Sequence, residues 1–89
     1  MRFRRSPRTL ERRVGAEVLV MTTDGPDVHE LSGGAVAVWE ELGSPRTVLE
    51  IVDRLAAEHA VESAEIAEQV RGCVDQLVGL GLVEELIDA

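Results

Sequence analysis

A Ser-Gly-Gly step at residues 32–34 separates two regions of different periodicity, and this change constrains the fold most. Before it, the segments "LERRV", "EVLVMT" and "DVHEL" are short, partly β-branched and bounded by turn residues, which is typical of strands. After it, apolar residues recur every three or four positions, which is typical of amphipathic helices. One change from period two to period 3.6 predicts an α+β domain.

Turn residues between the first three segments predict a three-stranded antiparallel meander. Gly15-Ala16 predicts a tight hairpin between the first two strands. "TTDGPD" at residues 22–27 predicts a second turn, because Gly tolerates positive φ and Pro fixes its own. In the third strand we expect Val28 to be the inward-facing residue.

Three helices are predicted after the step. Ser32, Thr47 and Ser63 are the expected N-caps, and Thr47 opens the capping box "TVLE". The break at residues 43–46 is the short turn of a helix-turn-helix. "LVEELI" after Gly81 predicts a short terminal strand or a docked tail. The third helix carries an apolar stripe of Ile66, Val70, Cys73, Leu77 and Leu80, with a second partial row of Ala67, Val74 and Val78 beside it.

Length and charge limit the domain and its partners. The 89 residues predict one domain, with a flexible basic arm over residues 1–8 and the folded part over residues 9–89. Residues 1–13 carry six Arg and one Glu, and the total charge of −8 leaves −13 for the remainder. A body this acidic repels phosphate backbones and acidic membranes, so nucleic acid is a poor partner for it. No apolar run is long enough to span a bilayer.

The residues with reactive side chains do not form a pattern that predicts catalysis. His29 and His59 have no further ligands at a spacing typical of zinc sites, so we expect no metal and no cofactor. Cys73 is the only cysteine and lies on the apolar stripe, where it is expected to pack as a small hydrophobe. Without a disulfide the cytoplasm is the expected location. So small a chain offers little material for a dry acid-base pocket, and we expect no enzyme activity.

The predicted meander suggests a binding function. An edge strand has free N–H and C=O groups that can pair with an extended peptide. If "DVHEL" lies beside the third helix, the two form a groove with a backbone wall and an apolar wall. The row Ala67, Val74 and Val78 then either receives side chains of a peptide or packs on the sheet, and the pattern leaves both interpretations open.

The sequence from "VHELSGGAVAVW" to "LVGLGLV" resembles the PqqD-like proteins, or RiPP recognition elements. The resemblance rests on the Leu31-Ser32 step, the small residues before Trp39, the segment "TVLEIVDRL" and the closing "LVGLGLV", and it extends from about Leu10 to Val83. It implies a winged helix-turn-helix that binds the leader segment of a ribosomally synthesised precursor peptide. It also implies presentation of that peptide to a modifying enzyme, such as a radical SAM protein or a peptidase.

On this interpretation the leader adds as a strand to the third strand and packs against the third helix. The expected peptide-binding residues are Asp27, Val28, His29 and Glu30 on the strand, and Ala67, Val70, Arg71, Val74 and Val78 on the helix. The acidic strand favours a neutral or basic leader, and Arg71 can pair with a leader carboxylate. The alternatives are a winged helix that binds DNA, which the net negative helices 47–60 and 62–80 oppose, and a regulator or adaptor that docks on another protein.

Overall fold

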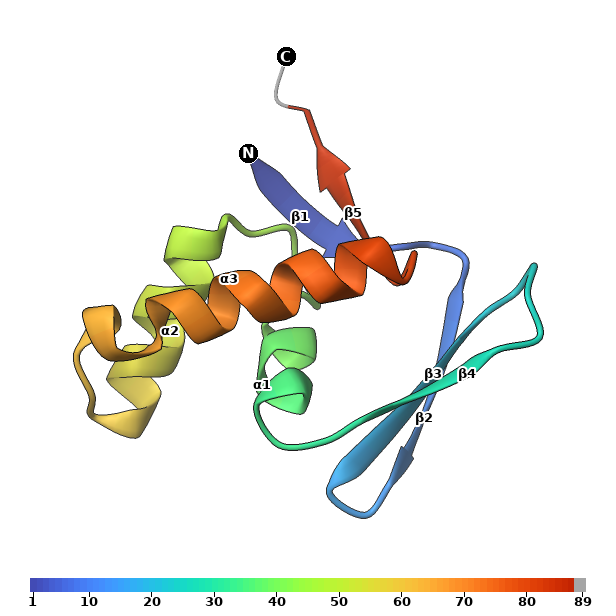
Figure 1. Cartoon of the computed structure of the whole chain (residues 1–89), viewed down its shortest axis with the longest axis horizontal. Helices are drawn as coiled ribbons and strands as arrows, with labels where there is room; N and C mark the ends of the chain where they lie inside the picture. The colour runs from blue at the N-terminus through green and yellow to red at the C-terminus, as the bar shows by residue number, and fades with distance from the viewer. Residues whose placement is uncertain (88–89) are drawn as a thin grey trace.

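The computed structural model describes residues 1–87, and within this range it contains five strands and three helices (Figure 1). The strands are β1 (Arg2–Arg5), β2 (Thr9–Val14), β3 (Glu17–Thr22), β4 (Val28–Leu31) and β5 (Val83–Leu86). The helices are α1 (Gly34–Glu41), α2 (Val48–His59) and α3 (Ser63–Gly79). None of these three helices is long and apolar enough to cross a bilayer. The predicted α+β order of three meander strands followed by three helices is confirmed, and "LVEELI" forms the terminal strand β5.

β2, β3 and β4 form an antiparallel sheet with β3 in the centre (Figure 1). Gly15 lies in the turn between β2 and β3 and has a φ of +63°, which glycine adopts without a clash because it has no Cβ. The register places Val18 of β3 opposite Leu31 of β4, and side chains alternate between the two faces of the sheet. Val18, Val20 and Leu31 therefore share the inner face, and all three are buried.

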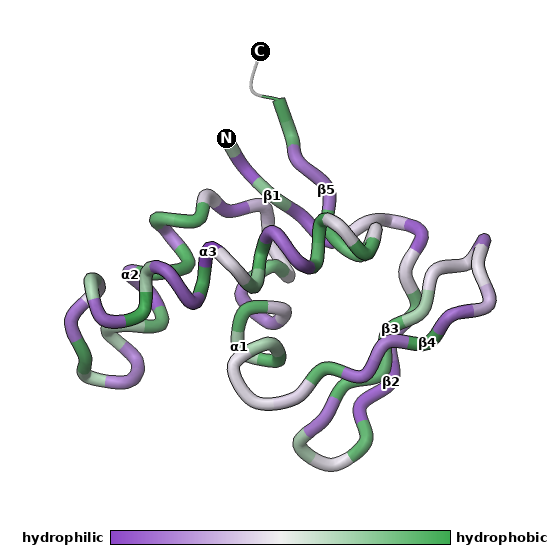
Figure 2. The backbone as a smooth tube through the Cα atoms, viewed as in Figure 1, coloured by the Kyte–Doolittle hydropathy of each residue, from purple (hydrophilic) through white to green (hydrophobic). Residues whose placement is uncertain are grey.

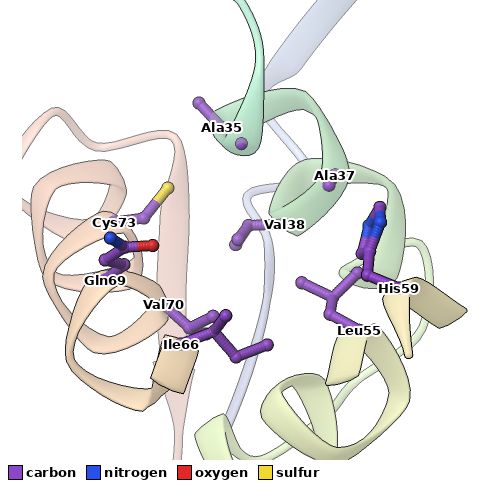
Figure 3. Close-up of a pocket in the computed structure, with 10 residues that line it drawn as sticks. Ala35, Ala37, Val38, Leu55, His59, Ile66, Gln69, Val70 and Cys73 are labelled. Atoms are coloured by element: carbon purple, nitrogen blue, oxygen red, sulfur yellow. The ribbon is translucent and has the colours of Figure 1, made fainter. Parts of the chain in front are cut away.

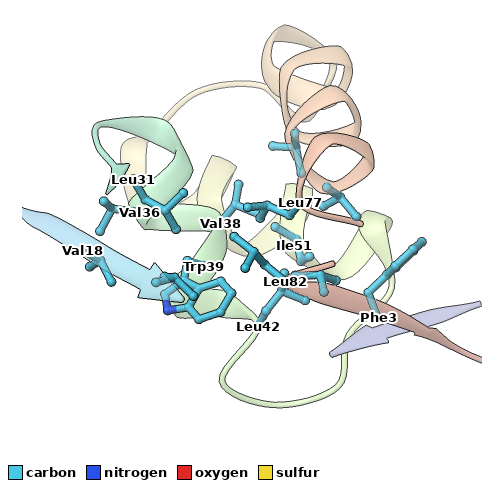
Figure 4. Packing of buried hydrophobic residues seen from close by; sticks show 14 of the residues in the cluster. Phe3, Val18, Leu31, Val36, Val38, Trp39, Leu42, Ile51, Leu77 and Leu82 are labelled. Atoms are coloured by element: carbon cyan, nitrogen blue, oxygen red, sulfur yellow. The ribbon is translucent and has the colours of Figure 1, made fainter. Parts of the chain in front are cut away.

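The helices close one hydrophobic core against this inner face (Figure 4). Apolar and polar residues alternate along α3 with the spacing of a helix that has one buried side (Figure 2). α2 and α3 pack against each other, and α1 contacts both. The largest fully buried side chains are Trp39, Leu42, Ile51, Leu82, Val18, Val20 and Val74.

The helices begin in different ways. Thr47 starts α2 as predicted, because its hydroxyl accepts the Glu50 N–H at 3.0 Å while the Glu50 carboxylate accepts the Thr47 N–H at 2.8 Å. The predicted cap at Ser32 is wrong: the N-cap of α1 is Gly33 at a φ of +57°, with no side-chain hydrogen bond. Ser63 is the first residue of α3 rather than its cap, and its hydroxyl donates to a carboxylate on α2.

The N-terminal segment departs from the expectation of a flexible arm. Residues 2–5 form β1, which pairs antiparallel with β5. Phe3 is buried, and its backbone N–H and C=O pair with Arg46 at 2.7 and 3.0 Å. Arg4 forms an ion pair with Glu84 at 2.6 Å. The arm is ordered because its hydrogen-bond partners lie at the other end of the chain, where local composition gives no sign of them.

Candidate functional site

β4 is one edge of the three-stranded sheet, on the side that leads into α1 (Figure 1). It pairs with β3 alone, so within residues 1–87 the N–H and C=O groups on its other side have no partner strand. Such groups can pair with an added strand. Val28, His29 and Glu30 of the segment selected from the sequence therefore lie at a free strand edge, and Asp27 immediately precedes it.

The side chains of β4 are arranged differently from the prediction. Leu31 is buried, and because strand side chains alternate, the half-buried His29 shares its face. Val28 and Glu30 point to the opposite face, where Val28 is 55% exposed. The prediction that Val28 faces inward is wrong, because burial of Leu31 next to α1 fixes the alternation of the whole strand.

An apolar cleft of about 280 Å³ opens where α1, α2 and α3 meet (Figure 3). Its lining begins at Gly34, three residues after the end of β4. Figure 3 shows Ala35 and Val38 of α1 across the cleft from Ile66 and Val70 of α3. The free edge and the cleft are thus consecutive along the chain, and together they offer backbone pairing followed by an apolar recess.

α3 presents a different flank to the cleft from the one predicted. Of the predicted helix residues only Val70 lines it, and Val70 is itself 5% exposed. At about 100° per residue, Ala67 and Arg71 lie on the other side of Val70 from the cleft. The α3 residues that line the cleft are Ile66, Gln69, Val70 and Cys73.

The second apolar row of α3 belongs mainly to the core. Val74 is fully buried, so it has no surface to offer a bound peptide. Ala67 and Val78 are partly buried and pack against the same cluster. Arg71 is exposed and forms no ion pair with another residue in the range 1–87. The sequence left open whether this row receives side chains of a peptide or packs within the domain, and Val74 packs within the domain.

Cleft residues that the sequence analysis missed carried a weak signal. Ile66 and Cys73 stand in the apolar stripe that was assigned wholly to the core, yet both are only partly buried. Gly34 belongs to the Ser-Gly-Gly step, where the sequence indicates only a change from strand to helix. Periodicity shows that a helix has a buried side, but it does not show which flank faces an opening.

The cleft lining is mostly apolar, with one thiol, Cys73, among its side chains. Burial raises the pKa of the Cys73 thiol, which disfavours the nucleophilic thiolate. Gln69 and His59 supply the polar part of the lining. Within residues 1–87 no group of three His, Cys, Asp or Glu side chains is close enough to hold a metal ion. The arrangement is suited to binding a side chain.

Carboxylates surround β4. Glu17 on β3 shares a hydrogen bond with Glu30 on β4, and this bond and the repulsion between the two carboxylates raise the pKa of Glu17. Asp27 is exposed immediately before the strand. A chain that pairs with this edge therefore enters a negative potential, which disfavours acidic partners.

Three antiparallel strands followed by three helices and a terminal strand define a small α+β domain of the winged helix-turn-helix type. The family model described as coenzyme PQQ synthesis protein D (PqqD) matches residues 17–83, and the chain belongs to this family. Proteins of the family are generally non-catalytic peptide-binding domains. The resemblance drawn from the sequence is confirmed.

The fold is also that of a solved structure described as "TbiB1 in Complex with the TbiA(beta) Leader Peptide". The two share 22% sequence identity and superpose with a TM-score of 0.80, over 96% of this chain and 99% of that one. No curated protein matches this chain. At this identity the likeness establishes the fold, and the leader peptide is a ligand of TbiB1.

Proposed function

We propose that this protein binds the leader segment of a ribosomally synthesised precursor peptide and presents it to a modifying enzyme. The observation that carries the proposal is the free edge of β4, which runs directly into the apolar cleft at Gly34. The family supports peptide binding, and the TbiB1 fold accommodates a leader peptide. This domain then acts as a peptide chaperone, and the chemical step belongs to a partner such as a radical SAM protein or a peptidase.

Two parts of the site have separate roles in this proposal. The edge of β4, with Asp27 immediately before it, supplies backbone hydrogen bonds, which are insensitive to the peptide sequence. The cleft supplies selectivity, because an apolar recess of about 280 Å³ has room for one large side chain. The leader is therefore expected to carry an apolar residue just beyond the segment that pairs with β4.

The charge of the site sets a second requirement for the leader. Asp27, Glu17 and Glu30 disfavour acidic residues in the segment that pairs with β4. Arg71 lies on the other flank of α3 from the cleft, so a leader carboxylate would have to leave the cleft to reach it. A neutral or basic leader is the expected ligand.

No observation favours the alternative of DNA binding. The helix that would enter a groove, α3, carries Glu65, Glu68 and Asp75 against the one cation Arg71, and all four are exposed. Each phosphate contact needs a cation, and this surface lacks them. Docking on another protein without a peptide is the alternative that the following experiment tests.

The decisive variant is Gly34→Leu. A Cβ at Gly34 meets no atom within 4 Å, so the fold accommodates a leucine there, and because the residue lines the cleft we expect the new side chain to occupy the recess. We expect the affinity for the leader encoded beside this gene to fall by roughly tenfold or more, since the cleft can no longer receive an apolar side chain. Isothermal titration calorimetry measures the change.

Gly72→Leu is the matched control. Gly72 lies on α3, a Cβ there also meets no atom within 4 Å, and the residue does not line the cleft. This variant should bind the leader as the unchanged protein does. Equal affinities of the unchanged protein and both variants would reject the cleft as part of the leader-binding site. A folded protein that binds the modifying enzyme but no leader would reject leader binding and support direct docking on the enzyme.

Strand addition has its own signature. The paired leader should lose binding when alternate backbone nitrogens are methylated and tolerate methylation of the nitrogens between them, because only every second N–H of a strand faces its neighbour. Tolerance at every position would exclude pairing with β4.

A further inference from the structure

The face of the three-stranded sheet that points away from the core carries a row of apolar side chains. The register places Leu10 of β2 opposite Met21 of β3, and Met21 opposite Val28 of β4. Leu10 and Val28 are 58% and 55% exposed. A shallow hollow of about 210 Å³ lies on this face. Three apolar residues from three strands thus form one row, which is exposed at its two ends and half-buried at Met21.

The neighbouring row is charged at its two ends. Arg12 of β2 lies opposite Leu19 of β3, and Leu19 lies opposite Glu30 of β4. Arg12 is exposed and has no ion-pair partner in the described part of the chain. From one edge of the sheet to the other, this row is positive, apolar and negative.

We propose that this face binds a second copy of the same chain. A two-fold axis parallel to the strands, midway between two facing sheets, places β2 of one protomer over β4 of the other and β3 over β3. Arg12 then faces the partner's Glu30 twice, and Leu10 faces the partner's Val28 twice. The face is self-complementary in both charge and apolarity, which is the property that an isologous interface requires.

The size of the face predicts a weak dimer. Three strands about 4.8 Å apart and three rows about 7 Å apart give a contact of roughly 300 Å² per protomer, less than half of a standard interface. The two Glu17 side chains approach each other across the axis and oppose association. We expect a dissociation constant on the order of 10⁻⁴ M.

Association through this face goes beyond leader binding and is independent of it. Sheets that pack face to face, aligned at about −30°, leave their edges free. The outer edge of β4 and the cleft at Gly34 therefore stay open in the dimer. Two leaders can be held by one dimer, and loss of one activity does not entail loss of the other.

Charge reversal tests the arrangement. Sedimentation velocity of the full chain over increasing concentration should show the average mass rising from monomer toward dimer. Arg12→Glu and Glu30→Arg should each weaken association about tenfold or more, because each sets like charges opposite one another. The double variant R12E/E30R should restore association, since the two-fold pairing is then re-formed with its signs exchanged.

Glu58→Arg, an exposed reversal on α2 away from this face, is the control and should leave association unchanged. R12E should also bind the leader with unaltered affinity, which separates this proposal from leader binding. A protein that stays monomeric at every concentration, or a double variant that associates as poorly as the single ones, would overturn the proposed interface.

Discussion

Arg5 connects three elements through one side chain. Its guanidinium stacks on the Trp39 ring, 4.6 Å from the ring centroid, and donates to the Trp39 carbonyl oxygen at 2.7 and 3.0 Å. It also pairs with Glu11 of β2 at 2.8 Å, and Glu11 accepts the indole N–H of Trp39 at 3.2 Å. The polar atom of the buried indole is thereby satisfied, and β1, β2 and α1 are held together.

Val74 and Val28 were both expected to bind the peptide, but their environments are opposite. Val74→Ala removes two methyl groups from a fully buried site and should lower the free energy of unfolding by about 2 kcal/mol. Val28→Ala acts on an exposed side chain and should change it by less than about 0.5 kcal/mol. Urea unfolding followed by Trp39 fluorescence compares the two. Equal losses would contradict the assignment of Val74 to the core and of Val28 to the surface.

At the scale of elements, α1 and α2 show two solutions to the start of a helix. α2 uses side chains, in the capping box of Thr47 and Glu50. α1 follows β4 too closely for this, and the chain turns at Gly33 in a conformation that favours glycine. The abrupt step from strand to helix is what brings the β4 edge next to the cleft.

The two helix starts predict different changes in stability when a hydroxyl is removed. Thr47→Ala should lower the free energy of unfolding by about 1 kcal/mol, because the Glu50 N–H loses its acceptor. Ser32→Ala should have little effect, since the Ser32 side chain does not cap α1. Thermal unfolding of both variants at neutral pH measures the difference. A comparable loss in Ser32→Ala would show that this hydroxyl has a stabilising contact.

The capping box also makes stability depend on pH. The Thr47 backbone N–H, and next its side chain, lower the pKa of Glu50. A carboxylate with a lowered folded-state pKa stabilises the protein above its unfolded value, near pH 4.3, and loses this contribution as the pH falls through the folded value. The stability advantage of the unchanged protein over Glu50→Gln should therefore disappear in acid. A stability difference between the two proteins that stays constant from neutral pH into acid would contradict the lowered pKa of Glu50.

At the scale of the whole molecule, the two ends of the chain close the domain. β1 and β5 pair with each other, and Phe3 packs into the core beside them (Figure 4). Leu82 and Val83, just before and at the start of β5, are buried in the same cluster. The basic segment at the N-terminus is therefore a structural part of the domain.

Phe3→Ala tests this closure. Loss of a buried aromatic side chain should lower the free energy of unfolding by about 3 kcal/mol. Arg2→Ala changes an exposed neighbour on the same strand and should cost less than about 0.5 kcal/mol. Chemical unfolding measures both, and a neutral Phe3→Ala would instead support the flexible arm expected from composition.

The sequence by itself determined the class of fold and the order of its elements from β2 onward. Period two before Ser32 and period 3.6 after Gly34 are local consequences of backbone geometry, so they are visible in short windows. The same holds for the hairpin at Gly15 and the capping box at Thr47, whose contacts span a few residues.

Tertiary structure alone decided which side of each element is buried and whether the N-terminal segment forms a strand. Val28 faces outward because Leu31 is buried, and Val74 is core because α3 turns the flank of Ile66 and Cys73 toward the cleft. β1 exists because β5, about eighty residues away, offers it a partner. These outcomes depend on packing between segments distant in sequence, which no local pattern records.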